Sequence, residues 1–521
     1  MNTFYIQQFG CRATQADGAA LERQLLDRGC TRSPDPATAS IVVLNTCTVT
    51  AAADAQARDA IRKIHAQNPH ARLIVTGCYA QRAPEELAVL PGVTHVVGNS
   101  HKPEIPALVT QIVPVARARA TREQHDIPSE ARNPLFSPAS LDAPFHSFLA
   151  EQQVAPHPGK IPASGSPPQR AQILTGDIFS HPEFLSAPIR GGESRHTRPI
   201  LKIQDGCNNR CSFCVIPYVR GKSRSLAPNE VVREVNALVA QTLPVRFYDE
   251  EPTPSPAREI VLSGINLGTY GRDLSPRVEF IDLLRRILDE TPLERLRISS
   301  IEPQDVTQDL IDLFSSTDRI AQHFHMPLQS ASDRILAAMH RWYRSEHYAR
   351  RISLIHDRLP QAAIGADVIS GFPGETESDH AATLDFITRH HFTYLHVFSY
   401  SSRPGTKAAT SPHQVPAHIT KRRARELRSL SEAKSAHFRS AQIGRTERVL
   451  TLRRDEDSIT ELTGTEYTPA LSSNYLRVQV PGIHPSNQWQ DVLITAEEGN
   501  YVVGEPASTN DEFFVPSAPS V

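Results

Sequence analysis

Three cysteines within eight residues constrain this chain more than any other part of its sequence. Cys207, Cys211 and Cys214 have the spacing C-x3-C-x2-C, and they follow residues 200–203, an apolar run that predicts a β-strand. Three thiolates on one short loop can ligate three irons of a cubane cluster and leave the fourth iron open to another ligand. The spacing therefore predicts an iron–sulfur site at the end of a strand.

Two other uses of these cysteines compete with the cluster. A zinc ion would require a fourth tetrahedral ligand in register, and none is obvious nearby in the sequence. Unrelated structural cysteines are the second alternative. The aromatic Phe213, directly before the last cysteine, completes a strong motif, and we adopt the cluster as our interpretation.

Three further cysteines occupy equivalent places in the first hundred residues. Each of Cys11, Cys47 and Cys78 stands just beyond a predicted strand and before a helical stretch. Because the carboxyl ends of neighbouring parallel strands face one crevice, we expect these thiols to converge on a second cluster with an open iron. The alternative is that they are buried apolar cysteines, among the most buried residue types. Cys30 has no such placement and is predicted to be structural.

The apolar runs divide the chain into five segments. Residues 1–113 alternate strands with helical stretches, which predicts an α/β domain with a doubly wound parallel sheet. Residues 114–192 hold twelve of the 41 prolines and predict a largely disordered linker or insertion. Residues 193–435 contain six βα units, as in a partial (βα)6 barrel. Residues 441–506 predict a small β-barrel punctuated by glycines, and 507–521 form a tail. The expected strands lie at 5–6, 41–44, 73–75, 95–97, 200–203, 259–262, 296–299, 322–325, 364–369 and 394–400.

The composition limits location and partners. Seven cysteines are an odd number in a chain whose N-terminus lacks a signal-peptide pattern, which argues against a disulfide framework and for a reducing, cytoplasmic setting. No apolar run is long enough to span a bilayer, so no membrane association is expected. The formal net charge of -2 means that any contact with nucleic acid must come from a local basic patch.

The loop at 207–214 resembles that of the radical SAM superfamily, and its continuation at 215–225 resembles the methylthiotransferases of that superfamily. The resemblance covers about residues 1–110 and 195–505. It implies two [4Fe-4S] clusters and S-adenosylmethionine as cofactors. It also implies that the second cluster delivers sulfur, while one S-adenosylmethionine supplies the methyl group and another supplies the radical. In the first domain the similar segments are 10–11, 45–47 and 77–79.

The resemblance also suggests which residues bind S-adenosylmethionine. In similar proteins the aromatic at the position of Phe213 packs near the adenine, and a turn like that at Ser263 and Gly264 binds the methionyl amino group. That turn here lacks the acidic residue that many superfamily members carry. Glu302 and Gly371 follow the third and fifth barrel strands, at the strand ends where barrel active sites lie. Turn chemistry alone is the alternative for these residues.

The C-terminal segment resembles the TRAM module, a small RNA-binding barrel, at 443–446 and 474–478. A compact barrel with basic and aromatic residues can bind RNA through phosphates and stacked bases. A solvated charged face is the alternative. The candidates for RNA contacts are Arg445, Arg448, Arg453, Arg454 and Arg477.

Residues 206–209 and 261–271 look most like the branch of the family that acts on N6-threonylcarbamoyladenosine at position 37 of tRNA. The implied reaction replaces the C2–H of the adenine with C2–SCH3, which makes tRNA the expected partner of a methylthiotransferase. The alternatives are another tRNA adenosine, an aspartate of a ribosomal protein, or a non-catalytic iron–sulfur sensor that binds RNA. We further expect a monomer and an electron donor of the flavodoxin or ferredoxin type.

Overall fold

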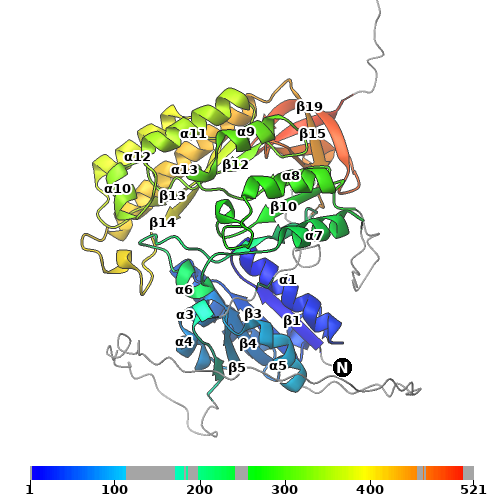
Figure 1. The fold of residues 1–521 in the computed structure, drawn as a ribbon, viewed down its shortest axis with the longest axis vertical. Coiled ribbons are helices and arrows are strands. Elements are labelled where there is room, and N and C mark those ends of the chain that lie inside the picture. Colours follow the sequence, from blue (N-terminus) through cyan, green and yellow to red (C-terminus); the bar gives the residue numbers. More distant parts are fainter. Residues whose placement is uncertain are drawn as a thin grey trace, which may run out of the picture.

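The computed structural model describes residues 3–112, 170–180, 184–185, 197–240, 256–454, 461–462 and 465–507. Within them, an N-terminal α/β unit, a central set of βα units and a C-terminal β-barrel follow one another along the chain. In Figure 1 the blue N-terminal unit lies against the green part of the central unit, and the red barrel lies at the far side. No helix in these ranges is long and apolar enough to cross a bilayer.

The N-terminal sheet has six parallel strands in the order β2-β1-β3-β4-β5-β6, and helices cover both of its faces, so that every residue of β3 is buried. Leu21 and Ile105 pack on one face, whereas Ile61 and Leu87 pack on the other. The expected doubly wound sheet is confirmed. The strands are β1 (Thr3–Gln8), β2 (Thr31–Arg32), β3 (Ile41–Thr46), β4 (Arg72–Gly77), β5 (Val93–Gly98) and β6 (Gln172–Leu174). The helices are α1 (Arg12–Asp27), α2 (Ala51–Gln67), α3 (Cys78–Arg82), α4 (Pro84–Ala88) and α5 (Ile105–Ile112).

Strand β6 falls inside the segment that we expected to be a largely disordered linker, 114–192. It pairs in parallel with β5, and His95 lies opposite Gln172. Its apolar residues are only half-buried because it is an edge strand. A run this short, in a proline-rich surrounding, carries no usable sequence pattern. Residues 113–169 lie outside the described residues, so the linker prediction stays a prediction for them.

The central unit is a partial barrel of six parallel strands, as expected. Three strands form a sheet in the order β11-β10-β7, three more form β12-β13-β14, and Leu296 bridges Ile320 where the two sheets meet. The strands are β7 (Ile200–Lys202), β10 (Glu259–Ser263), β11 (Arg295–Ile298), β12 (His323–His325), β13 (Ala363–Ser370) and β14 (Tyr394–Ser399). The helices are α7 (Pro228–Ala240), α8 (Phe280–Glu290), α9 (Gln308–Ser315), α10 (Asp333–Ala338), α11 (Ser345–Arg358), α12 (Glu377–Arg389) and α13 (Ala417–Ser440). After β7 come β8 (Gln204–Asp205), α6 (Ile216–Arg220) and β9 (Arg224–Ser225).

The barrel strands alternate between an apolar and a polar environment. Leu296 and Phe324 belong to the buried apolar cluster that the strands share with the helices around them. Their strand neighbours Arg297 and His325 face the opposite, inner side, because successive side chains of a strand point in opposite directions. The inner side of the partial barrel is therefore polar.

The C-terminal unit is a closed barrel. Its strands follow the order β15-β19-β20-β18-β17-β16, and β15 pairs both with its neighbour β19 and with β17 near the other end of this order. Its core holds small branched side chains such as Val449, Val478 and Val492, which suit the narrow interior of a five-stranded barrel. The strands are β15 (Thr446–Thr451), β16 (Glu461–Leu462), β17 (Thr465–Ser472), β18 (Arg477–Pro481), β19 (Trp489–Glu498) and β20 (Tyr501–Pro506).

Buried arginines attach this barrel to the central unit. Arg295 and Arg297 point from β11 toward β17, and Arg297 donates to the backbone carbonyls of Ser472 and Ser473 at 2.9 and 3.1 Å. Both guanidinium groups are also paired with the fully buried Glu259. Burial acts to raise the pKa of Glu259, but the arginines outweigh it and hold the pKa well below its ordinary value. The carboxylate of Glu259 therefore stays charged and balances the positive charges of Arg295 and Arg297.

Replacing Glu259 tests this attachment. Glu259→Gln leaves the buried arginines without their anion, and we expect it to lower the free energy of unfolding at the interface by about 3–5 kcal/mol. Trp489 reports on the interface, because the Arg295 guanidinium lies 4.3 Å from its ring. Its fluorescence during urea unfolding, in a Trp342→Phe background, gives the midpoint. Arg285→Ala removes only the exposed pair with Asp282 and should leave the midpoint nearly unchanged.

Candidate active site

The three cysteines of the N-terminal unit lie at the carboxyl ends of three neighbouring strands. Cys11 follows β1 and precedes α1, Cys47 follows β3, and Cys78 is the first residue of α3 after β4. Cys47 and Cys78 are buried, whereas Cys11 is exposed. The structure thus brings these residues to the carboxyl end of the parallel sheet, as the sequence predicts.

Two glycines with positive φ let the loops approach one another. A Cβ atom on Gly10 would lie 2.7 Å from the Sγ of Cys47, and Gly10 has a φ of +89°. A Cβ atom on Gly77 would lie 2.2 Å from the carbonyl oxygen of Thr46. No L side chain fits at either position, so glycine is required for the close approach of the cysteine loops.

The thiols of this set interact electrostatically. Burial raises the pKa of Cys47 to about 12, and the neighbouring Cys78 and Cys11 add to the effect. Three thiolates at this site would repel one another unless a cationic group lay among them. The donor set therefore fits a metal cluster, whose positive iron ions allow the sulfurs to ionise.

The second set, Cys207, Cys211 and Cys214, lies on the loop between β8 and α6. Burial raises the pKa of Cys214 to about 12, and the other two cysteines contribute. Neighbouring elements fix the loop through Ser212, whose backbone N–H donates to the Met339 carbonyl at 3.1 Å. The Ser212 hydroxyl also donates to the carbonyl of Ala338 at 2.8 Å. A cavity of about 300 Å³ is lined by two of the three cysteines.

The spacing of the sulfur atoms argues against zinc. In neither cysteine set do all three sulfurs lie within 4.8 Å of one another, among the described residues. A tetrahedral zinc site with Zn–S bonds of about 2.3 Å would hold its sulfurs about 3.8 Å apart. Both sets are too wide for one ion, and a cluster of several metal ions fits them better.

The expected cofactor-binding residues gather around the second cysteine loop. Ser263 is the last residue of β10, and Gly264 follows it beside Gln204, three residues before Cys207. Phe213 packs edge-on against Phe372, the neighbour of Gly371, with ring centroids 6.3 Å apart. Their role in cofactor binding stays a prediction.

Glu302 reaches the same loop through an arginine. Arg341 pairs with the carboxylate of Glu302 and donates to the Sγ of Cys211 at 3.4 Å. Burial raises the pKa of Glu302, although the arginine opposes this effect. Glu302 therefore orients a cation that faces a cysteine sulfur.

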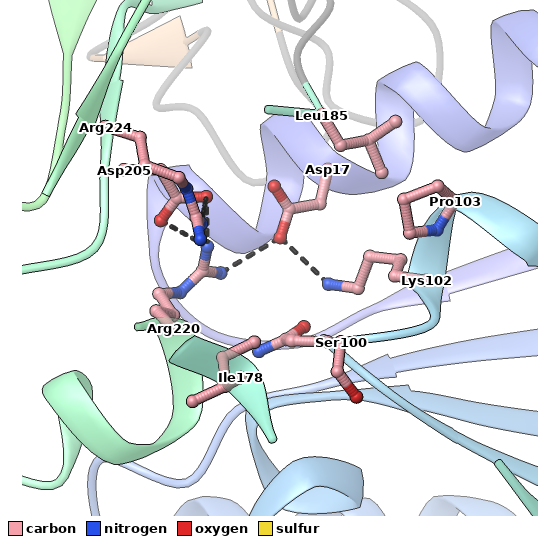
Figure 2. Close-up of a pocket in the computed structure, with 10 residues that line it drawn as sticks. Asp17, Ser100, Lys102, Pro103, Ile178, Leu185, Asp205, Arg220 and Arg224 are labelled. Atoms are coloured by element: carbon pink, nitrogen blue, oxygen red, sulfur yellow. Dashed lines mark hydrogen bonds and ion pairs between the residues drawn. The ribbon is translucent and has the colours of Figure 1, made fainter. Parts of the chain in front are cut away.

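A buried ion network joins the two cysteine sets. Figure 2 shows Asp17 of α1 between Lys102 and Arg220, and Asp205 beside Arg220. Lys202 pairs with both carboxylates. Burial acts to raise the pKa of Asp17, but the three cations outweigh it and lower the pKa to about 2. Three cations face only two carboxylates, so this network carries an excess of positive charge. The cations are Lys102, Lys202 and Arg220, and the carboxylates are those of Asp17 and Asp205.

Arg220 places part of this charge beside the first cysteine set. It ends α6, six residues after the second set ends at Cys214. Burial acts to lower the pKa of Arg220, but Asp17, Asp205 and the thiols of Cys78 and Cys11 together raise it well above its ordinary value. A side chain that follows the second cysteine set therefore lies close to the thiols of the first.

A second link comes from the loop after β14. Arg403 is buried and pairs with Asp54 of α2, which also accepts from Arg82 at 3.0 Å. Ser401 accepts a hydrogen bond from the backbone N–H of Ala51 at 3.1 Å. The Arg403–Asp54 pair and the hydrogen bond of Ser401 together hold the segment that follows Cys47 against the central unit.

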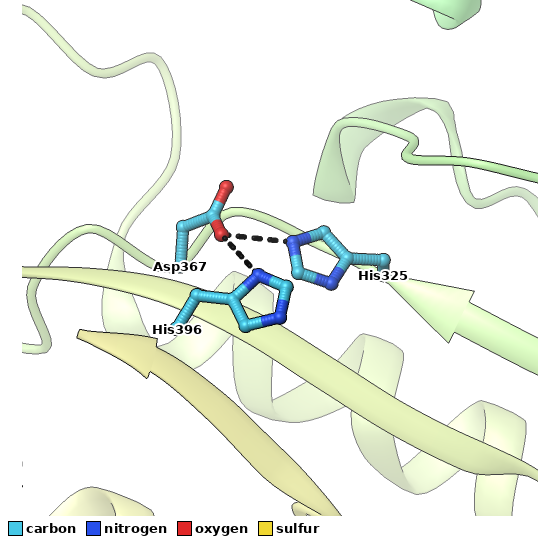
Figure 3. Close-up of side chains that lie close together, drawn as sticks. All are labelled: His325, Asp367 and His396. Carbon is cyan, nitrogen blue, oxygen red and sulfur yellow. Dashed lines mark hydrogen bonds and ion pairs between the residues drawn. The ribbon is translucent and has the colours of Figure 1, made fainter. Parts of the chain in front are cut away.

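The inner wall of the barrel carries a third polar group. In Figure 3, His325 and His396 both point at the carboxylate of Asp367, at 2.9 and 3.3 Å. Burial acts to raise the pKa of Asp367, but the two rings outweigh it and hold the pKa well below its ordinary range. The Tyr394 hydroxyl lies 3.1 Å from the other ring nitrogen of His325 and 2.8 Å from His323.

Two family models match the chain. The model described as "Uncharacterized protein family UPF0004" matches residues 3–98, and the "Radical SAM superfamily" model matches residues 201–387. The threonylcarbamoyladenosine tRNA methylthiotransferase MtaB of Bacillus subtilis is 31% identical, over 92% of this chain and 91% of that protein. MtaB of Aquifex aeolicus is 30% identical over 94% and 99% of the two chains. The tRNA-2-methylthio-N(6)-dimethylallyladenosine synthase of Sphingopyxis alaskensis is 32% identical over 97% of each.

The chain belongs to the radical SAM methylthiotransferase family. A solved structure with a similar fold is the radical S-adenosylmethionine methyltransferase TsrM from Kitasatospora setae. It superposes with a TM-score of 0.51 at 15% identity and covers 82% of this chain and 84% of that one. The family membership confirms the resemblance on which the expected cofactors, two [4Fe-4S] clusters and S-adenosylmethionine, were based.

The arginines expected to bind RNA in this methylthiotransferase have different surroundings. Arg445 and Arg477 are exposed on the C-terminal barrel. Arg448 lies 4.8 Å from the ring of Trp489 and 3.6 Å from the carboxylate of Glu294, so it takes part in the contact with the central unit. RNA binding by these residues stays a prediction. Arg453 is exposed, and Arg454 pairs with Glu466.

Several residues of the site were missed by sequence reasoning because their partners are distant in the chain. A signal was present for two of them: Lys202 interrupts an apolar strand, and Asp17 stands among alanine and glycine in α1. Charged residues at buried positions require partners, and this rule marks them as members of a network. The residues without a predicted role were Arg12, Asp17, Lys102, Lys202, Arg220, His325, Arg341, Asp367, His396 and Arg403.

Iron content tests the two cysteine sets. Anaerobically reconstituted protein should hold about eight irons, and alanine at all three cysteines of either set should leave about four. Cys30→Ala is the matched control, because Cys30 is a buried cysteine outside both sets and should leave the content unchanged. Iron and labile sulfide are measured together. Full iron content after replacement of one whole set would contradict the assignment of that set.

Asp17→Asn tests the ion network. The change leaves buried cations without a carboxylate, and we expect a loss of about 3–5 kcal/mol in the stability of the contact between α1 and α6. Faster amide hydrogen exchange in both helices would report the loss. Asp27→Asn, at the exposed end of the same helix, should not change the exchange. Equal exchange in the Asp17 variant and the native protein would show that the network does not hold the two units together.

Proposed function

We propose that this chain is a tRNA methylthiotransferase that replaces the C2–H of N6-threonylcarbamoyladenosine at position 37 with C2–SCH3. The proposal rests on the two cysteine sets, because the buried Arg220 follows the second set in the chain and its charge interacts with the thiols of Cys78 and Cys11 in the first. A reaction that joins sulfur to a carbon activated by a radical requires the sulfur donor and the source of the radical to reach the same carbon atom. Relatives at 30% and 31% identity are named for this same substrate.

The reaction explains why the site is built around two clusters. The C2–H of an adenine is a poor acid at neutral pH, and its carbon is a poor electrophile, so no acid or base alone opens this bond. The bound clusters and S-adenosylmethionine supply the carbon-centred radical, the sulfur and the methyl group. The task of the protein is to hold the thiols, exclude water and position the base.

We assign the roles of the side chains accordingly. Cys11, Cys47 and Cys78 would hold the sulfur-delivering cluster, and the second cysteine set would hold the radical cluster. Around the second set, Phe213, Ser263, Gly264, Glu302 and Gly371 would bind S-adenosylmethionine. Arg341 supports this assignment, because it connects Glu302 to a cysteine sulfur.

The C-terminal barrel would bind the tRNA. Arg445, just before β15, and Arg477, on β18, are exposed arginines of the predicted set, and they are available for phosphate contacts. We keep the division of the chain at 1–113, 114–192, 193–435 and 441–506 as part of the proposal. A cytoplasmic location, a monomeric state and an electron donor of the flavodoxin or ferredoxin type complete it.

Mass spectrometry of tRNA tests the substrate. A strain that lacks the gene should lose the 2-methylthio derivative and accumulate N6-threonylcarbamoyladenosine. Native protein and Cys30→Ala should restore the derivative, whereas Cys47→Ala and Cys214→Ala should not, since each removes a cluster ligand. Loss of the 2-methylthio group from dimethylallyladenosine instead would assign the protein to the other tRNA branch. An unchanged tRNA profile would contradict a role in tRNA modification.

A further inference from the structure

Arg12 stands between the first cysteine set and the polar inner side of the barrel. It is the first residue of α1 and directly follows Cys11. One turn later on the same helix face, Ala16 packs against Ile200 and Val261 of the barrel strands. Both strand residues alternate with residues of the outer apolar cluster, so this face of α1 covers the inner side. Arg12 therefore lies beside Cys11, on the helix face that covers the inner side of the barrel.

The charge of Arg12 acts on two groups inside the central barrel. Burial lowers the pKa of His323 and raises the pKa of Tyr394. The positive charge of Arg12 is among those that lower both pKa values. Other inner cations have carboxylate partners: Arg297 pairs with Glu259. Within the described part of the chain, Arg12 makes no hydrogen bond or ion pair, and its side chain is only half-buried. It is a half-buried cation that no carboxylate of the described residues pairs with.

The wall opposite is polar. The carboxylate of Asp367 lies within hydrogen-bonding distance of both His325 and His396, as Figure 3 shows, and His396 is exposed. Tyr394 fixes the remaining nitrogen of His325. The region between Arg12 and this wall therefore offers hydrogen-bonding groups and the unpaired charge of Arg12. It suits an anionic, hydroxylated group and does not suit an apolar one.

The proposed substrate ends in such a group. N6-threonylcarbamoyladenosine carries a carboxylate and a hydroxyl at the end of its N6 substituent, whereas a dimethylallyl group is apolar and uncharged. In the adenine ring only N1 separates C2 from C6, the carbon that bears N6. A base whose C2 lies at the cysteine site thus brings its N6 substituent close to the residue that follows Cys11.

We propose that Arg12 binds the carboxylate of the N6-threonylcarbamoyl group and selects this nucleoside against uncharged N6 substituents. The inference rests on the proposed function and names a specificity-determining residue within it. A planar guanidinium can form two parallel hydrogen bonds with a carboxylate, which gives direction as well as charge. The neighbouring Cys11 would then place the sulfur site and the recognition site on consecutive residues.

Three anticodon stem–loop RNAs separate this role from a general contact with RNA. One carries N6-threonylcarbamoyladenosine at position 37, the second carries its uncharged terminal carboxamide, and the third carries adenosine. We expect the anaerobically reconstituted, full-length protein to bind the first RNA about ten- to hundredfold more tightly than the second. Arg12→Gln should weaken binding of the first RNA by a similar factor and leave the other two nearly unchanged. Fluorescence anisotropy gives each Kd.

Two variants act as controls. Arg12→Lys keeps the positive charge and should keep part of the preference for the carboxylate, although it loses the two-point geometry. Arg28→Gln removes an exposed arginine after the far end of the same helix and should change none of the three Kd values. Iron content is measured for each variant, because Arg12 is next to a cysteine of the first set.

The outcomes are distinct. Equal weakening of all three RNAs in Arg12→Gln would assign Arg12 to the phosphate backbone or to the cluster, and would overturn the inference. Retention of the full preference for the carboxylate in that variant would overturn it as well. If the native protein forms the 2-methylthio product on the first RNA in either case, the proposed function stands. If the native protein forms no product and shows no preference, the proposed function itself fails.

Discussion

The side chain of Arg220 is buried where the N-terminal unit meets the central unit, and the relation between the two units depends on its charge pairs. It donates to Asp17 at 3.0 Å and to Asp205 at 2.9 Å, and these carboxylates come from different units. A buried pair of this kind adds little net stability compared with apolar packing, but removal of one partner leaves an uncompensated charge. The network therefore acts mainly as a constraint on orientation. Its excess positive charge also suits neighbouring thiolates, which must be ionised to bind iron.

Most of the fold and the six cysteines could be predicted from the sequence, because both follow from local patterns. Strand-then-cysteine-then-helix repeats around Cys11, Cys47 and Cys78, and parallel topology brings strand ends together. The network could not be predicted in this way, since Asp17 and Arg220 are far apart in the chain. Strand β6 was missed for a related reason: its edge position leaves it without the apolar alternation by which strands are recognised.

Basic residues show the limit of sequence reasoning most clearly. The run of basic residues at 421–425 in α13 contains Arg423, which is buried and pairs with Glu375. Glu375 accepts a hydrogen bond from the backbone N–H of Gly371, so the pair fixes the turn that begins there. Arg448 serves the contact between units through Trp489. In the sequence Arg448 is a candidate for contact with RNA, because a sequence reports charge and not exposure. Only the contacts decide which arginines remain available to RNA.

Stacked rings connect the C-terminal barrel with the inner wall of the central barrel. Tyr475, in the C-terminal barrel, has a φ of 66° and stacks on His323 at 4.3 Å. His323 in turn contacts the Tyr394 hydroxyl, which also contacts His325 beside Asp367. A non-glycine residue with positive φ is strained, and the stack and its neighbours must hold it in place. The orientation of the C-terminal barrel is thereby tied to the polar wall that faces Arg12, so one rigid arrangement sets both where a tRNA would lie and where its modified base would enter.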